Sequence, residues 1–333
     1  MTDDDPMARL LRAAGPRPAV PLETAARVKS VLRSHWRAEV QAVRRRRTSL
    51  WAVSSVAAAV ALIVMIGRGQ WGPDAKPSGK AEPVATLQRS EGSVRGQDGA
   101  PLRIGDGLTP GSEIATGIDG RAALALAAGT SVRLDTDSWV LLTTGSILDL
   151  KRGAVYIDSG ARQARSSPVM VRTELGIVRD VGTQFEVRIQ DGGLQVSVRE
   201  GIAHLSRGGR PFQVEAGTRL LVRAEGAVET RALPVQGPDW DWVLAIAPAF
   251  SLEGRTLGDY LDWVSRETGW RVQFADPSIS QAAPREILHG SIEGLRPDET
   301  PAAVLPACGL RHHLTGGTLI IEHPEGSGRH DSH

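Results

Sequence analysis

Few side chains of this chain have the type and spacing needed for chemistry. Asp135 and Asp137 stand two residues apart, as paired carboxylates for acid–base catalysis can. A turn after the apolar run SVRL explains the two aspartates more simply. A polysaccharide-acting enzyme is nevertheless a hypothesis to test. It predicts that both carboxylates share a groove with Asp149, Asp158 and Arg133.

The histidines and the single cysteine do not form a metal-binding pattern. His312 and His313 are adjacent, so in a strand they would point to opposite faces. Cys308 cannot form a disulfide within the chain. We interpret it as a small buried residue, because a reactive thiol needs a histidine or a basic cluster beside it. The other late histidines stand in a Gly- and Ser-rich tail without a cysteine partner: His323, His330 and His333.

Two further patterns fail when their context is considered. Gly67, Gly69 and Gly72 match G-x-G-x-x-G, but no strand precedes them and no helix follows. The run DWDW, which contains Trp240 and Trp242, could stack on a sugar ring, although packing between domains is the simpler explanation. The sequence therefore predicts a non-enzymatic protein, with no catalytic, cofactor-binding or metal-ligating residue and no cofactor.

The composition is that of a globular protein. A chain of 333 residues has room for about two domains. An apolar fraction of 41% and a net charge of +1 do not suit a disordered protein or one that coats nucleic acid. We therefore expect no direct contact with nucleic acid.

An apolar run between residues 48 and 68 is the most decisive local feature. Leu50 to Gly67 are 18 residues without a charge. As a helix they extend about 27 Å at ~1.5 Å per residue, which nearly matches the ~30 Å hydrocarbon core of a bilayer. Trp51 and Trp71 stand near the two ends, where amphipathic rings favour the interface. The sequence predicts a single transmembrane helix over residues 48–68, with a buried core helix as the alternative.

The charges beside this run predict its direction. A block of four arginines precedes the run, whereas three separated basic residues follow it. The positive-inside rule therefore places residues 1–47 in the cytoplasm and the later domains outside. A cleaved signal peptide does not fit, because its polar lead would be 47 residues long and no A-x-A-like site follows. The basic residues are Arg44, Arg45, Arg46 and Arg47 before the run, and Arg68, Lys76 and Lys80 after it.

Residues 1–47 contain one amphipathic helical pattern. Apolar side chains recur every three or four positions, as on one stripe of an α-helix. So short a segment cannot easily bury that stripe alone. Three interpretations stay open: an extension of the anchor helix, a docking site for a partner protein, or a contact of the arginine block with lipid headgroups. The stripe consists of Ala25, Val28, Leu32, Trp36, Val40 and Val43.

After a Gly- and Pro-rich linker over residues 69–85, the pattern changes to short strands. Runs such as RAALALA and LQVSV are separated by glycines, often about eight or sixteen residues apart. Glycine tolerates a positive φ, so this spacing indicates regular sharp turns. The sequence predicts a mainly β protein with an all-β domain over residues 86–232, built as a sandwich or as a coiled β-solenoid.

The order of motifs in this region resembles that of the FecR family. AAGTSVRLDTDSWV, LKRGAVYIDSG, PVMVRTELGIVRDVGTQFEV, LQVSVREGIAHL and EAGTRLLV follow one another over about residues 100–225. Conservative replacements of the family's usual residues occur at Asp135, Ile157 and Val169. The resemblance implies an extracytoplasmic all-β module that signals across the inner membrane of Gram-negative bacteria. It also implies a cytoplasmic end that binds an extracytoplasmic-function sigma factor.

VGTQFEV, the most specific part of the resemblance, is expected to be structural. Gly182 suits a corner, and Phe185 and Val187 would lie on the buried face of a strand. Gln184 and Glu186 would then face water. The motif residues to which we assign a structural role are Gly182, Thr183, Phe185, Gly201 and Gly217.

Residues 240–323 have the pattern of a small α+β domain. Apolar spacing predicts a helix that ends at Gly269, followed by the strand RVQF and a Pro-containing loop. ILHGSIEGL reads as a second strand and RPDETPAAVLPACG as a second helix, which Pro306 should kink or shorten. LRHHLTGGTLIIE reads as a hairpin around Gly316 and Gly317.

This arrangement resembles the short N-terminal (STN) domain of secretins and TonB-dependent receptors, over roughly residues 249–322. Such domains bind proteins, so the resemblance implies a TonB-dependent receptor or another periplasmic protein as partner. Residues 324–333 complete the chain as a flexible tail.

Three functional hypotheses follow. The first is a single-pass inner-membrane signal transducer of the FecR type, with its C-terminal domains in the periplasm. Val28, Leu32, Trp36 and Val40 would then bind a sigma factor. The second is an anchored periplasmic scaffold that binds glycan or protein and has no sigma-factor client. The third is the enzyme considered above. For the first two, the lipid bilayer is a further partner.

Overall fold

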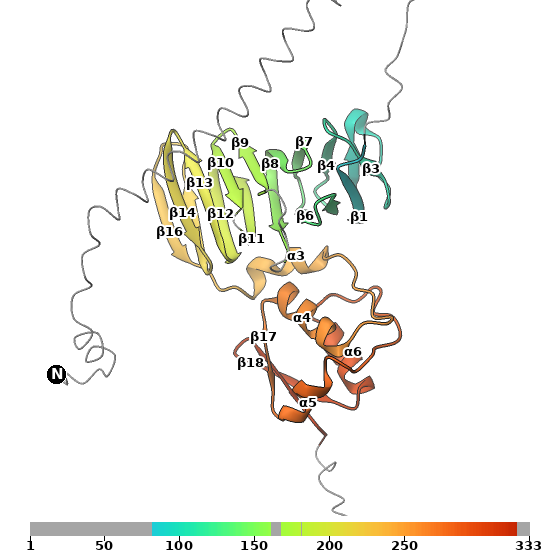
Figure 1. The fold of residues 1–333 in the computed structure, drawn as a ribbon. Helices are drawn as coiled ribbons and strands as arrows, with labels where there is room; N and C mark the ends of the chain where they lie inside the picture. Colours follow the sequence, from blue (N-terminus) through green and yellow to red (C-terminus); the bar gives the residue numbers. More distant parts are fainter. Residues whose placement is uncertain (1–81, 161–167, 181, 325–333) are drawn as a thin grey trace, which may run out of the picture. The chain divides into compact units, whose positions relative to one another are not determined.

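The computed structural model describes residues 82–160, 168–180 and 182–324 (Figure 1). They belong to one compact unit, Lys80–His333. Among these residues, no helix is both long and apolar enough to cross a membrane. The predicted span over residues 48–68 and the predicted N-terminal helix lie outside the described residues. Val28, Leu32, Trp36, Val40 and the arginines at 44–47 lie outside them as well.

The described chain up to residue 232 is built from sixteen short strands. Many carry a buried apolar side chain at every second position, as a strand with one covered face does. The strands are β1 (Ala85–Glu91), β2 (Val94–Gly96), β3 (Gly107–Leu108), β4 (Glu113–Thr116), β5 (Arg121–Leu126), β6 (Ser131–Leu134), β7 (Trp139–Thr144), β8 (Ile147–Asp158), β9 (Met170–Thr173), β10 (Gly176–Asp180), β11 (Gln184–Gln190), β12 (Gly193–Glu200), β13 (Ile202–Arg207), β14 (Arg210–Glu215), β15 (Thr218–Val222) and β16 (Val228–Ala232).

These strands form two sheets. Sheet A has the order β3-β1-β5-β6-β8-β11-β12-β15-β16. Sheet B has the order β2-β4-β7-β8-β9-β10-β13-β14. Neighbours are antiparallel except for β8 and β9. The coils of a β-solenoid stack in parallel, so this pairing favours the sandwich alternative.

Strand β8 belongs to both sheets. Its first half pairs with β7 and β9 in sheet B, and its second half pairs with β6 and β11 in sheet A. The change occurs near Gly153, where φ is 78°. A Cβ atom there would lie 2.4 Å from Ser138 Oγ. Glycine therefore allows the chain to bend from one layer into the other without displacing Ser138.

The inner faces of the two sheets enclose one apolar core. Burial of each large aliphatic or aromatic side chain in such a core stabilises the fold by roughly 1.5–3 kcal/mol. The core includes Leu87, Leu124, Val155, Phe185 and Val187 from sheet A, and Ile114, Leu142, Leu148 and Val178 from sheet B.

After β16 the chain forms a small α+β domain with its own core. Its three-stranded sheet has the order β17-β19-β18, with β19 parallel to β17 and antiparallel to β18. Tyr260, Leu261, Val264, Leu305 and Ile321 are buried in this core. The elements from residue 238 on are η2 (Pro238–Trp240), α3 (Asp241–Ala245), α4 (Leu257–Thr268), β17 (Arg271–Phe274), α5 (Pro277–Ala282), α6 (Thr300–Ala307), β18 (Arg311–Thr315) and β19 (Thr318–Glu322).

Helix α4 has well-defined ends. The Thr256 hydroxyl accepts from Asp259 N–H at 3.0 Å, and the Asp259 carboxylate accepts from Thr256 N–H at 3.2 Å, which is a capping box. Gly269, with φ of 74°, ends the helix as the sequence predicts. Strand β17 and the β18–β19 hairpin also lie where the sequence predicts them.

Two predicted elements of this domain are wrong. The predicted loop after β17 contains α5, which begins with an Asp276 cap and Pro277. Proline is common at the first position of a helix, but here it was interpreted as a loop residue. ILHGSIEGL is not a strand: only Ile287 forms an isolated bridge, with Thr256. Helix α6 has eight residues, and Pro306 stands in its last turn, in keeping with the predicted shortening.

Candidate functional site

The outer face of sheet A is covered around Gln184 and Glu186. Gln184 and Glu186 lie there at 2% and 3% exposure, so the prediction that they face water is wrong. Trp242 of α3 and the C-terminal end of α4 contact this face. Alternation along β11 correctly separates its two faces, but it does not tell whether the second face meets water or another part of the chain.

Aromatic rings from the segment after β16 pack on this face. Tyr156 of β8 contacts Trp240 and Trp242 edge-on, with centroids 6.0 and 6.4 Å apart. Trp240 Nε1 donates to Pro234 O at 2.8 Å, and Trp242 Nε1 donates to Glu186 Oε1 at 3.2 Å. Both indoles are buried. The DWDW run therefore packs on sheet A, and its Asp241 lies 3.9 Å from Arg296 of the C-terminal domain, which agrees with packing between domains.

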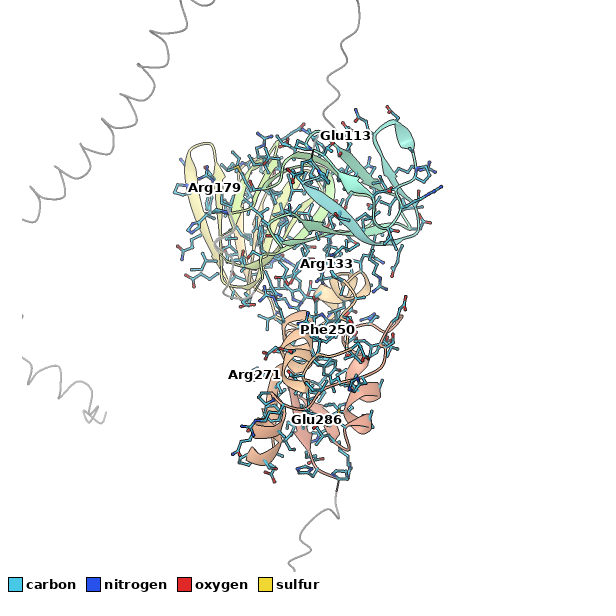
Figure 2. All side chains as sticks on the ribbon, turned by 45° about the vertical axis from the view of Figure 1, so that its right-hand side comes forward. Glu113, Arg133, Arg179, Phe250, Arg271 and Glu286 are labelled. Carbon is cyan, nitrogen blue, oxygen red and sulfur yellow. The ribbon has the colours of Figure 1, made fainter. Side chains whose placement is uncertain are left out.

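Arg133 of β6 is the most deeply buried charge at this interface (Figure 2). Its Nη2 donates to Glu267 Oε1 at 2.8 Å and its Nη1 donates to Val243 O at 3.0 Å. The guanidinium also lies over the Tyr156 ring, 5.4 Å from the centroid. Burial alone would lower the pKa of Arg133, but the Glu267 carboxylate raises it, so the arginine stays charged.

The C-terminal end of α4 is capped by side chains of sheet A. Arg199 Nη1 donates to Glu267 O at 2.7 Å, and Gln184 Nε2 donates to Arg266 O at 3.1 Å. Carbonyls at this end of a helix have no partner within the helix, and its partial negative charge favours a cation. A Cβ atom at Gly269 would lie 2.9 Å from Arg199 Nη2, so glycine makes room for the cap.

A second ion pair joins α4 to sheet A. Arg266 donates two hydrogen bonds to the Asp158 carboxylate and a third, at 3.3 Å, to Glu200 Oε2. Burial alone would raise the pKa of Asp158, but hydrogen bonds from Arg266 hold it below its ordinary value. The interface is therefore ionic as well as aromatic.

Each carboxylate of the enzyme hypothesis is held by its own arginine partner or partners, which suits a structural role. The pairs are Asp135 with Arg121 and Arg188, Asp137 with Arg152, Asp149 with Arg172, and Asp158 with Arg266. Arg133 pairs with Glu267 instead.

The described residues contain no group of three or more His, Cys, Asp or Glu side chains placed to hold a metal ion. His312 and His313 are neighbours on β18, and His323 follows β19, whereas His330 and His333 lie outside the described part of the chain. Burial, followed by the Glu286 charge, raises the pKa of the Cys308 thiol, which disfavours a reactive thiolate.

The FecR-motif residues stand at turns and in the core. Gly182, Gly201 and Gly217 have φ of 71°, 78° and 78°. A Cβ atom at Gly201 would lie 2.7 Å from Thr183 Cγ2, so this turn packs against the start of β11. Thr183 and Phe185 are buried.

Sequence reasoning did not assign the interface residues Arg133, Arg199, Arg266 and Glu267 to an interface. One signal was available, because SVRL and SVRE each place an arginine within an otherwise apolar strand. On a strand with one solvent-exposed face, an arginine on that face is common. Only the residues that cover the sheet show that it is buried.

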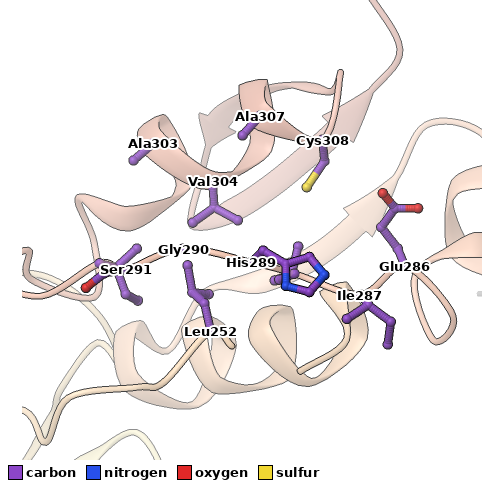
Figure 3. Close-up of a pocket in the computed structure, with 12 residues that line it drawn as sticks. Leu252, Glu286, Ile287, His289, Gly290, Ser291, Ala303, Val304, Ala307 and Cys308 are labelled. Atoms are coloured by element: carbon purple, nitrogen blue, oxygen red, sulfur yellow. The ribbon is translucent and has the colours of Figure 1, made fainter. Parts of the chain in front are cut away.

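Two adjoining grooves lie in the C-terminal domain. The first, of about 390 Å³, runs between residues 286–292 and α6 (Figure 3). The second, of about 290 Å³, lies beside α5, with Ile279 and Leu310 in its lining. Glu286 and Cys308 line both. These grooves offer apolar surface and few charges, as binding grooves commonly do.

The chain is similar to two solved structures. Two crystal structures from Parabacteroides distasonis, at 2.50 and 1.65 Å resolution, are similar to it and are described as a "putative anti-sigma factor". Both are 16% identical and cover 64% of this chain and 98% or 99% of their own, with TM-scores of 0.34 and 0.35. The comparison with curated proteins found no match.

Part of the β-sandwich matches a known protein family. Residues 112–204, from just before β4 into β13, match the model described as "FecR protein". The match contains the VGTQFEV motif on which the sequence resemblance depends. Residues 112–204, which lie in the β-sandwich, are therefore a FecR domain.

Proposed function

We propose that this chain is a single-pass inner-membrane regulator of the FecR type. The observation that carries the proposal is the FecR match over residues 112–204. Members of this kind transmit a signal to an extracytoplasmic-function sigma factor, which would be the partner on the cytoplasmic side. The uncharged run Leu50–Gly67 supplies the membrane anchor, and the preceding arginine block orients it.

The structure supports a binding role for the periplasmic part. Its described residues form a stable sandwich and a small α+β domain with apolar grooves, joined by buried ion pairs. A protein partner, for which a TonB-dependent receptor is one proposal, would bind the C-terminal domain. Force or displacement applied there would reach the FecR domain through Arg133, Arg199 and Arg266.

Membrane orientation is tested with a reporter fused after Glu322. The proposal expects alkaline phosphatase to be active at this position and green fluorescent protein to be dark, because only the former folds in an active form outside the cytoplasm. The opposite pattern would place the C-terminal domains inside and contradict the proposal.

The sigma-factor partner is tested by a pull-down with the detergent-solubilised full chain. The amphipathic stripe predicts that Leu32→Ala/Trp36→Ala loses the sigma factor, because two large apolar contacts are removed. Ser30→Ala/Ser34→Ala, on the opposite side of the predicted helix, is the matched control and should retain it. If the unchanged chain retains no sigma factor, the anchored scaffold becomes the better explanation.

A further inference from the structure

The segment 286–290 of the C-terminal domain is hydrogen-bonded along one edge only. Leu288 N–H donates to Arg255 O at 2.7 Å, and Leu288 O accepts from Gly254 N–H at 3.2 Å. Glu286 O accepts from Leu257 N–H at 2.8 Å. The antiparallel bridge of Ile287 with Thr256 completes this inner edge.

The opposite edge is open. Residues of an extended chain alternate between its two edges, so the main-chain groups of Ile287 and His289 point away from residues 254–257. Within the described residues, no hydrogen bond is formed by the N–H or C=O of either. The Ile287 side chain is also 49% exposed. Neither proline nor lysine, the residues that usually protect an open edge, occurs in ILHGSI.

The larger groove runs along this open edge. One wall is formed by every residue from Glu286 to Ile292, and the other by small or branched side chains on one face of α6 (Figure 3). A groove that met only one side-chain face of an extended segment would be lined by every second residue. Here consecutive residues line the groove, so it runs beside the main chain. The α6 wall consists of Ala303, Val304, Ala307 and Cys308.

The chemistry of the groove identifies what it can hold. Leu252, Leu288 and Ile292 make it apolar, and its volume of about 390 Å³ leaves room for side chains. Among the lining residues Glu286 is the only carboxylate, and none is a lysine or an arginine. Residues 240–323 contain eleven acidic and six basic residues, so the domain carries a net charge of −5. This field attracts a cationic partner.

We propose that the open edge of residues 286–290 binds an extended basic segment of another protein by strand addition. Main-chain hydrogen bonds to Ile287 and His289 hold the segment, and its alternate apolar side chains enter the groove beside α6. A lysine or arginine of the segment lies near Glu286. The proposal deepens the proposed function by naming the chemistry of the periplasmic partner, and it depends on that function only for the partner's identity.

The test measures binding of a fluorescent peptide of alternating lysine and valine, about nine residues long, enough for one strand. The receptor is the detergent-solubilised full chain, and the readout is fluorescence anisotropy. A peptide of the same sequence with an N-methyl group on every residue is the first control, because methylation of alternate residues would leave the N–H donors of one edge free. It cannot donate the main-chain hydrogen bonds, so we expect its binding to be lost.

Two variants locate the site. Ala307→Trp fills the groove, and Ile287→Pro removes an N–H that has no partner within the described chain. Each should weaken binding about tenfold or more, the loss expected when a few contacts of this kind are removed. Ala302→Trp, on the same helix but outside the groove lining, is the matched control and should bind like the unchanged chain.

The outcomes decide the proposal. Should Ile287→Pro fail to fold, as near-ultraviolet circular dichroism would show, Ala307→Trp against Ala302→Trp remains a complete test. Equal binding by those two variants, equal binding of the methylated peptide, or no binding by the unchanged chain would each overturn it. Self-association that Ala307→Trp abolishes, without peptide binding, would mean that a second copy occupies the groove instead. None of these results depends on the topology or the sigma-factor experiment.

Discussion

At the scale of single residues, Arg133 shows how one side chain can join the sandwich to the domain that covers it. Its neighbours Val132 and Leu134 are core residues of the sandwich, while its guanidinium is buried on the opposite face of the sheet. A buried charge without partners would be costly. Arg133 avoids most of that cost through the Glu267 carboxylate, the Val243 carbonyl and the Tyr156 ring.

Gly153 provides the clearest prediction at this scale. Gly153→Ala should destabilise the fold by about 1–3 kcal/mol more than Gly129→Ala, because both residues have a positive φ but only Gly153 would bring its Cβ against Ser138. A Cβ atom at Gly129 meets nothing within 4 Å. Urea unfolding of the two variants measures the difference. Equal midpoints would show that β8 does not need glycine to pass between the sheets.

At the scale of elements, the end of α4 is where helix and sheet depend on each other. The capping box at Thr256 and Asp259 completes the N-terminal end from within the helix. The C-terminal end receives the Arg199 guanidinium from sheet A, and the helix's own Arg266 pairs with Asp158 of that sheet. A helix whose last carbonyls are bonded by another element is fixed in position as well as in structure.

This junction predicts a dependence of stability on pH. The folded-state pKa of Asp158 is lowered from 3.8, so its contribution is present above pH 3.8 and is lost as pH falls through the lowered value. We expect the urea midpoint of the unchanged chain to be higher than that of Asp158→Asn. Above about pH 5 the difference between the two midpoints should be constant. The difference should shrink at lower pH, where protonation removes the Asp158 charge.

Comparison with the variant is the control, because the other carboxylates titrate in both proteins. Their effects cancel in the difference between the two midpoints at each pH. A difference that stays constant down to the acid limit would show that the Asp158 charge does not stabilise the junction.

At the scale of the whole molecule, the described part of the chain has two apolar cores joined by an interface that is both aromatic and ionic. The sandwich and the C-terminal domain each bury their own aliphatic residues. Between them stand the aromatic residues of the segment after β16 and a few arginines. Hydrogen-bond networks of this kind make an interface more rigid.

Glu267→Gln should make the two domains unfold in separate steps. It leaves Arg133 buried without its counter-charge, a change that typically costs about 3–5 kcal/mol. We expect one unfolding transition for the unchanged chain and two for the variant, with Trp263 and Trp270 reporting the earlier loss of the C-terminal domain by fluorescence. Glu293→Gln, an exposed change in the same domain, should keep a single transition. Two transitions in the unchanged chain would mean that the domains are not coupled.

Much of the fold could be predicted from the sequence because it follows from local rules. Period-two runs and glycine spacing indicate an all-β region, and the apolar stripe ending at Gly269 indicates α4. The motif order identifies the FecR domain. Local rules failed where two signals competed. Pro277 read as a loop residue although it begins α5, and ILHGSIEGL read as a strand although only one bridge pairs it.

The sequence alone determined the all-β region, helix α4 and the buried inner face of β11, since these depend on neighbours along the chain. Tertiary structure alone decided that Gln184 and Glu186 are covered, that Arg133 meets Glu267, and that residues 286–290 keep an open edge. The reason is physical. Alternation distinguishes the two faces of a strand, but which atoms finally cover the second face depends on residues far away in sequence, here 134 positions from Arg133 to Glu267.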